Sequence, residues 1–195
     1  MILAGIDLGQ PADRVAPQLL GCVLRLGPVA VRLTEVEAYL SSGDPAAHSH
    51  RGLTRSNAQL FGPPGRLYVY ISYGIHRAGN LVCGAEGTGQ GCLMRGGEII
   101  GGLAEARRRR GDVPDERLAR GPGNLGRALG LTTDLNGEPL DGSGAAGLEL
   151  RAREAEPEWV QGPRIGISKN TEAPLRFWLP GDPTVSSPRT RRAAV

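Results

Sequence analysis

The sequence predicts a single domain of short β-strands and many turns, with a few short helices, rather than a helical bundle. A length of 195 residues is typical of one domain. The 30 glycines and 15 prolines interrupt the chain too often for long helices. Several short segments also alternate between apolar and polar side chains, which is the period of a β-strand. The hydrophobic fraction of 39% is enough to form a core at this length.

The first third of the chain predicts a helix, two strands and a long loop. Residues 17–24 are typical of a helix end that continues into a strand, and residues 30–39 alternate as the next strand. Residues 41–65 are polar and rich in glycine and proline, so they predict a loop. Within it we expect a short helix at 56–61, capped from residues 55–57. Long ordered loops in a compact domain are more often functional than not.

A hairpin follows, with strands at 66–73 and 80–83 and a turn at 74–79. A second turn at 87–91 leads into a strand at 92–95. The remaining predicted elements are a helix at 104–110, a glycine-rich turn and short helix at 121–130, strands at 146–152, 164–168 and 174–179, and a disordered basic tail at 188–195.

Charge and composition are compatible with a protein that binds nucleic acid. The net charge is +3, and Lys169 is the only lysine among 23 basic residues. The arginines reflect either the codon bias of a GC-rich genome or the use of planar guanidinium groups on phosphates and base edges. The run Arg107–Arg110 is in the same way either a solvated helix face or a set of phosphate contacts. The glycine-rich turn, including Gly123 and Asn124, could present backbone N–H groups to a phosphate, although it matches neither the P-loop nor the dinucleotide-binding fingerprint.

Other features concern the location of the protein. There is no apolar run of 18 residues, so we expect no membrane span. The N-terminus has no basic region and carries an early acid, so we expect no secretory signal. Three cysteines without a C-x-x-C pair suit free thiols in a reducing cytoplasm.

The aromatic residues are concentrated in one short segment. Three of the four tyrosines, Tyr68, Tyr70 and Tyr73, fall within six residues. Alternation places Tyr68 and Tyr70 on one face of a strand, and Tyr73 lies beside Gly74 where a turn is expected. The rings either fill a sheet core or contact a flat heterocycle such as a nucleobase.

Two acids and an imidazole accompany the fourth tyrosine. Glu35 and Glu37 lie on one strand face with Tyr39, and His48 follows nine residues later. Aromatic faces above and below a purine, with a carboxylate to activate water, are the groups that a purine-reading site needs. Solvent-exposed acids are the alternative explanation.

These segments, in their order and spacing, resemble the alkyladenine (3-methyladenine) DNA glycosylases over most of the chain. The matching blocks are residues 19–21, 35–39, 44–48, 61–65, 67–74, 93–95, 121–125, 162–167 and 174–178, together with Asn80. The resemblance implies a mixed α/β single domain over residues 1–187. Its core is a curved antiparallel β-sheet with peripheral helices and a protruding hairpin that wedges into DNA.

The resemblance also implies an activity. A monofunctional DNA glycosylase flips damaged purines (3-methyladenine, 7-methylguanine, hypoxanthine and ethenoadenine) out of duplex DNA and hydrolyses the N-glycosidic bond. It needs no cofactor or metal. We expect a monomer in the cytoplasm, associated with the nucleoid, whose partner is double-stranded DNA with damaged purines.

Site roles follow from the matching positions. Glu37 matches the general base that activates water, and Arg95 matches an arginine that orients the water or a nearby phosphate. Tyr39 matches the residue that stacks on one face of the flipped base. His48 and Tyr70 match those that cover the other face.

Two further positions concern discrimination and base flipping. Asn80 matches an asparagine that clashes with the 2-amino group of guanine, and Tyr73 matches the wedge that fills the gap in the duplex. The sequence departs from the family at residues 75–79, where relatives often carry Met and bulkier aromatic residues. We therefore expect His76 and Arg77 to face phosphate.

Two rival functions remain. One is a non-catalytic damaged-DNA-binding protein on the same scaffold, for which a carboxylate such as Glu37 facing phosphate would be of no use. The other is a metal enzyme using His48, His50 and His76, whose spacing is a poor zinc signature. A glycosylase that also cuts the strand needs an amine, and Lys169 is the only internal one, so we expect no lyase activity.

Overall fold

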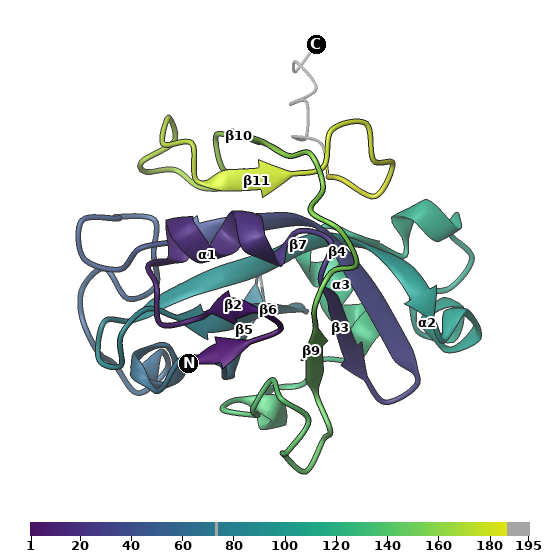
Figure 1. Ribbon diagram of the computed structural model, residues 1–195, viewed down its shortest axis with the longest axis horizontal. Helices are drawn as coiled ribbons and strands as arrows, with labels where there is room; N and C mark the ends of the chain where they lie inside the picture. Colours follow the sequence, from purple (N-terminus) through teal and green to yellow (C-terminus); the bar gives the residue numbers. More distant parts are fainter. Residues whose placement is uncertain (73, 187–195) are drawn as a thin grey trace.

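The computed structural model describes residues 1–72 and 74–186. The predicted wedge Tyr73 and the predicted tail at 188–195 lie outside these residues. Within them the chain forms a mixed α/β structure with a two-stranded sheet, a nine-stranded antiparallel sheet and three α-helices (Figure 1).

The strands are β1 (Ile2–Leu3), β2 (Ile6–Asp7), β3 (Val23–Leu26), β4 (Val29–Tyr39), β5 (Leu67–Ser72), β6 (His76–Cys83), β7 (Gln90–Gly101), β8 (Ala119–Arg120), β9 (Glu149–Arg151), β10 (Val160–Gly162) and β11 (Arg176–Trp178). The α-helices are α1 (Ala12–Leu19), α2 (Leu103–Arg110) and α3 (Pro122–Leu129). Short 3₁₀ helices are η1 (Ala58–Phe61), η2 (Asp115–Arg117) and η3 (Thr133–Leu135).

The long strands β4 and β7 form the centre of the large sheet and cross most of the molecule in Figure 1. The sheet has the order β10-β11-β4-β7-β6-β5, while β3 joins β4 to β9, and β8 pairs with β7. Strand β4 therefore has paired neighbours on both edges, β7 on one and β3 and β11 on the other. Its residues from Leu33 to Ala38 are all buried.

The helices add apolar faces to the core. Helix α1 contributes Val15 and Leu19, and α3 contributes Leu125 and Leu129, all of them fully buried. Helix α3 approaches β6 so closely that a Cβ at position 126 would lie 2.0 Å from the carbonyl oxygen of Arg77. Gly126 is therefore needed where the helix crosses the strand.

Most elements expected from the sequence are present, including the strand at 30–39 and the helix at 104–110. The turn expected at 74–79 is confirmed only at Gly74 and Ile75, because β6 already begins at His76, which pairs with Ser72 of β5. The strand expected at 164–168 is also wrong, because the segment that pairs with β11 is β10, just before it. The strand expected at 92–95 is longer, since β7 continues through Gly96 and Gly97.

The prediction that a side chain of residues 55–57 caps the short helix in the long loop is not confirmed. The side chain of Asn57 makes no cap bond to η1. It accepts from the N–H of Thr54 at 2.6 Å and donates to the carbonyls of His48 and Gly52 at 3.0 Å each. Asn57 thus ties together the loop that carries His48.

The arginine run on α2 is held within the protein. Arg107 bonds Asp115, and Arg108 and Arg109 bond Glu105. Arg110 donates to a backbone carbonyl at 2.8 Å. All four guanidinium groups thus have partners within the protein, while the side chains of Arg107 and Arg108 are 55% and 72% exposed.

None of the helices in the described ranges is both long and apolar enough to cross a membrane.

Candidate active site

Strand β4 places two carboxylates and a phenol on one face. Val36 and Ala38 alternate with Glu35, Glu37 and Tyr39 and belong to the hydrophobic core. Both glutamates have no exposed surface, so neither is one of the solvent-exposed acids that the sequence left as an alternative. A buried carboxylate needs hydrogen bonds or a counter-charge, and both are present.

A β-bulge directs Arg95 at these carboxylates. In the ladder between β4 and β7, Glu35 is opposite Gly96 and Val36 is opposite Met94, so Arg95 is the extra residue. Bulges turn a side chain out of the regular alternation and are frequent beside active sites. The Nε atom of Arg95 lies 3.4 Å from a carboxylate oxygen of Glu35 and 3.4 Å from one of Glu37.

The carboxylate of Glu37 has three partners. The N–H of Ile165 donates to Oε1 at 2.8 Å, and the hydroxyl of Tyr39 donates to Oε2 at 3.0 Å. Arg95 supplies the positive charge. Burial raises the pKa of Glu37 above its ordinary value, while Arg95, Ile165 and Tyr39 each oppose this shift. Burial also raises the pKa of Tyr39 well above its ordinary value, so its hydroxyl remains a donor at neutral pH.

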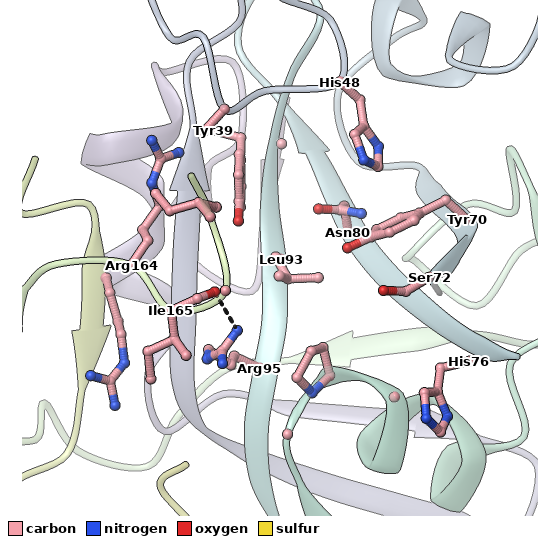
Figure 2. Close-up of a pocket in the computed structure, with 18 of the residues that line it drawn as sticks. Tyr39, His48, Tyr70, Ser72, His76, Asn80, Leu93, Arg95, Arg164 and Ile165 are labelled. Carbon is pink, nitrogen blue, oxygen red and sulfur yellow. Dashed lines mark hydrogen bonds between the residues drawn. The ribbon is translucent and has the colours of Figure 1, made fainter. Parts of the chain in front are cut away.

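A cavity of about 1700 Å³ opens over this network. Its volume exceeds the roughly 300–1,000 Å³ of a typical small-molecule pocket. Tyr39 and Arg164 lie on one side, His48 and Tyr70 lie on the other, and Asn80 and Leu93 lie between them (Figure 2). Glu37 itself does not line the cavity, but Tyr39, Arg95 and Ile165, its three partners, do.

His48 and the two strand tyrosines form an aromatic cluster. The His48 ring packs edge-on to Tyr70, with ring centroids 4.4 Å apart. Tyr68 stacks behind Tyr70 at 5.9 Å and is 3% exposed. Tyr68 also packs on Leu60 and Val82, so it serves both the core and the cavity wall. Burial lowers the pKa of His48, which keeps the imidazole neutral near pH 7.

A buried ion pair supports Tyr39. Asp44 and Arg164 form a bidentate pair with both distances 2.7 Å, and their side chains are 2% and 0% exposed. The Arg164 guanidinium lies 4.5 Å from the centroid of the Tyr39 ring and also donates to the carbonyl of Ala38 at 2.9 Å. Asn170 donates to Asp44 at 3.1 Å. The pair therefore joins the loop that carries His48 to the segment that carries Ile165.

Some of the residues predicted to contact phosphate line the cavity. Gly123 and Asn124, at the start of α3, line the cavity beside His76. The Asn124 side chain donates to the carbonyl of Arg120 at 2.7 Å. Arg77 is exposed but does not line the cavity.

The structure thus brings Tyr39, His48, Tyr70, Asn80 and Arg95 around one cavity and buries Glu37 behind them. Sequence reasoning assigned no role to Asp44, Arg164 or Ser186. Lys169, the only lysine in the sequence, also lines the cavity. Asp44 and Arg164 fall within matched blocks, which was the only available signal. Within the described residues, no three His, Cys, Asp or Glu side chains are grouped to hold a metal ion.

Comparison with known proteins gives a consistent family. The sequence matches the profile of the family described as "Methylpurine-DNA glycosylase (MPG)" over residues 7–183. A protein of Corynebacterium efficiens named "Putative 3-methyladenine DNA glycosylase" is 58% identical over 96% of this chain and 99% of its own length. Proteins with the same name from Corynebacterium glutamicum and Cutibacterium acnes are 60% and 51% identical, over 94% and 95% of this chain and 96% and 100% of their own lengths.

Proposed function

The chain belongs to the methylpurine-DNA glycosylase family, and from this premise we propose that it removes damaged purines from duplex DNA by hydrolysing the N-glycosidic bond. The proposed substrates are 3-methyladenine, 7-methylguanine, hypoxanthine and ethenoadenine. One observation supports the chemistry most directly: a buried glutamate is held by three groups that line an aromatic-walled cavity.

In this proposal the flipped base stacks between Tyr39 and the pair His48 and Tyr70. Flipping a nucleotide costs a few kcal/mol, and stacking on aromatic side chains returns about 1–3 kcal/mol per base. Alkylated purines carry positive charge, which the faces of tyrosine rings attract. A neutral His48 suits such a base, because an imidazolium beside it would be repulsive.

Glu37 acts as the general base in this mechanism. It removes a proton from a water molecule that attacks C1′ of the damaged nucleotide, and its charge stabilises the developing sugar cation. Arg95 holds the ionised carboxylate from β7, and the carbonyl of Ile165 accepts from Nη1 of Arg95 at 3.4 Å (Figure 2). The Tyr39 hydroxyl donates to the same carboxylate, so the stacking platform also orients the base.

Asn80 is the proposed filter against guanine. It is 6% exposed and lies between the two aromatic walls. In this proposal the 2-amino group of a flipped guanine clashes with its side chain. Tyr73 is the proposed wedge into the duplex. The backbone N–H groups at Gly123 and Asn124, with Arg77 further out, are the proposed phosphate contacts.

The proposed product is an abasic site without strand cleavage. All the groups invoked come from one chain, so a monomer is sufficient. The proposed place of action is the chromosome in the cytoplasm, and no cofactor takes part.

The test is an assay of free base release. Purified protein is incubated with duplexes that carry a single hypoxanthine or ethenoadenine, and with duplexes methylated at purines. We expect release of the damaged base and an intact strand until alkali cleaves the abasic site. Tight binding to lesion duplexes with no base release would instead support the alternative of a non-catalytic damaged-DNA-binding protein.

A further inference from the structure

Residues 182–186, here called the C-terminal strap, pass directly over the bulged part of β4 and β7. Asp182 pairs with Arg32 at 3.0 Å, and the hydroxyls of Thr184 and Thr34 lie 2.7 Å apart. Arg120 donates to the carbonyl of Val185 at 2.8 Å. Each of these contacts joins the strap to residues far away in the sequence.

Ser186 ends the strap inside the charged network behind the cavity. Its N–H donates to Glu35 at 2.7 Å, and its carbonyl accepts from Arg176 at 2.7 Å. Its hydroxyl accepts from Nε of Arg95 at 3.1 Å. Both backbone polar groups and the side chain of this residue therefore contact the network.

The irregular ladder between β4 and β7 makes these contacts possible. Two neighbouring bulges leave Thr34 and Arg95 as extra residues, and these two side chains bond Thr184 and Ser186 of the strap. Between them, a Cβ at position 96 would lie 2.9 Å from the carbonyl oxygen of Thr184. Gly96 is therefore the residue that allows the strap to approach the sheet.

We propose that Glu35 and Ser186 are positioning residues that hold the guanidinium group of Arg95 against Glu37, an inference that rests on the proposed function. The argument concerns the Nε atom of Arg95, which lies 3.4 Å from each of the two carboxylates. By distance alone, this arginine favours neither glutamate.

The other hydrogen bonds of Glu35 and Arg95 indicate which of the two glutamates Arg95 pairs with. Arg176 and the N–H of Ser186 already bond the two oxygens of Glu35. Ser186 takes the Nε–H of Arg95 at 3.1 Å, a shorter distance than either carboxylate offers. The Nη1 group of Arg95 is then directed to the carbonyl of Ile165 and to Glu37, at 3.4 and 3.5 Å.

The charges of the network also favour a pairing of Arg95 with Glu37 and of Arg176 with Glu35. Glu35 and Glu37 carry two negative charges, and Arg95 and Arg176 carry two positive charges, so the network is neutral as a whole. The remaining groups near Glu37 are Tyr39, which is neutral, and Arg164, which is paired with Asp44. Without the charge of Glu35, Glu37 would be the only carboxylate of the network that balances Arg95 and Arg176.

The first experiment changes only the hydroxyl of Ser186. We compare wild type, Ser186→Ala and Ser186→Thr in single-turnover base release from a hypoxanthine duplex. Thermal unfolding and duplex affinity are measured in parallel. We expect Ser186→Ala to slow release at least tenfold while lesion affinity changes less than twofold, and Ser186→Thr to restore most of the rate. Ser143→Ala is the matched control, because that serine bonds only Asp141 on an exposed loop and its loss should leave release unchanged.

The second experiment uses Glu35→Gln and the pH dependence of release. The negative charge of Glu35 contributes to the raised pKa of Glu37. Removal of that charge should move the acid limb of the rate profile to lower pH. It should also reduce the plateau rate, since Glu35 no longer helps to hold Arg95 in position. A purely structural role for Glu35 would lower the unfolding temperature without moving the limb.

The outcomes separate this inference from the proposed function. Wild-type release rates in Ser186→Ala, or an unmoved acid limb in folded Glu35→Gln, would overturn the positioning roles while leaving the glycosylase proposal intact. Equal losses of affinity and rate in Ser186→Ala would also overturn them. No release by wild-type protein would overturn the proposed function itself.

Discussion

The hydroxyl of Tyr39 lies 3.0 Å from Oε2 of Glu37 and donates a hydrogen bond to it. The proposed stacking residue, Tyr39, therefore contacts the proposed general base, Glu37. Arg164 lies against the Tyr39 ring, 4.5 Å from its centroid. The Tyr39 side chain is thus held at two points, by the guanidinium group of Arg164 against its ring and by the carboxylate of Glu37 at its hydroxyl. A base that stacks on Tyr39 is placed relative to Glu37 at the same time.

Tyr39→Phe should separate these two functions. The ring remains, but Glu37 loses a hydrogen bond that lowers its pKa. The general base must be ionised, so activity is present above this pKa and falls as the pH drops through it. With the pKa raised further, the acid limb of the rate profile should move to higher pH, while lesion affinity stays close to wild type.

Tyr68→Phe is the matched control for the pH profile. Its hydroxyl lies 3.4 Å from His48 and 3.4 Å from the carbonyl of Ser56, and does not bond Glu37. The acid limb should stay in place. A limb that moves equally in both variants would show that the hydrogen bond to Glu37 is not its cause.

Glu37→Gln should abolish most base release without loss of lesion binding. The amide keeps the shape of the side chain but accepts no proton from water, and general-base catalysis contributes about 10²–10⁴-fold. Single-turnover release on a hypoxanthine duplex should therefore fall by at least two orders of magnitude, with affinity within a few-fold. Release at an unchanged rate would contradict the role of Glu37.

The alternation of side chains made the central strand predictable. Residues 30–39 have a clear period of two, and β4 occupies almost that range. The predicted boundaries fit less well elsewhere, since the turn expected at 74–79 includes Gly79 and the strand expected at 92–95 stops just before Gly96. Both lie within strands, where neighbouring groups would meet a Cβ at 2.6 and 2.9 Å. Close packing from distant segments requires these glycines, and the local sequence does not show such contacts.

The sequence also indicated only part of the site: the cavity-lining residues, but not the residues that support them. The matched blocks assign Tyr39, His48, Tyr70, Asn80 and Arg95 to the site, and all five line one cavity. Their roles in base binding and catalysis stay predictions. The supporting residues did not emerge from the sequence, since Asp44 pairs with Arg164 over 120 positions and Glu35 meets Ser186 over 151. Pairings over such distances depend on the fold as a whole.

Tyr73→Ala tests the proposed wedge, which the sequence places between β5 and β6. A ring that fills the gap left by a flipped nucleotide contributes most where a gap exists. Binding to duplexes with an abasic site should weaken more than binding to undamaged duplexes, measured by fluorescence anisotropy at one salt concentration. Equal weakening on both would mean that Tyr73 is a general contact.

Asp44→Asn should destabilise the fold strongly. Removal of one partner from a buried ion pair leaves an uncompensated charge on Arg164, at a cost of about 3–5 kcal/mol. For a protein of this size, that lowers the unfolding temperature by roughly 6–20 °C. Asp115→Asn, which breaks the exposed pair with Arg107, is the control and should change the temperature little.

The same pair predicts a dependence of stability on acid. Burial opposes the charge on Asp44, but the bonds from Arg164 and Asn170 outweigh it and hold its pKa below the ordinary value. A lowered folded-state pKa means that this stabilisation is present above about pH 4 and is lost as the pH falls further. Chemical unfolding of wild type should show this loss, and Asp44→Asn should show a smaller one. Identical acid profiles would contradict the contribution of Asp44.

Borohydride should trap no covalent complex between this protein and damaged DNA. A strand-cleaving glycosylase attacks with an amine, and Lys169 is the only lysine in the chain. It lines the cavity, but the residue is exposed, whereas a lysine nucleophile is typically activated by desolvation or a neighbouring cation. Hydrolysis through Glu37 leaves no Schiff base to reduce. An adduct that forms in wild type and disappears in Lys169→Arg would assign lyase chemistry to Lys169, and one that persists in that variant would implicate the N-terminal amine, which lies 3.3 Å from Asp7.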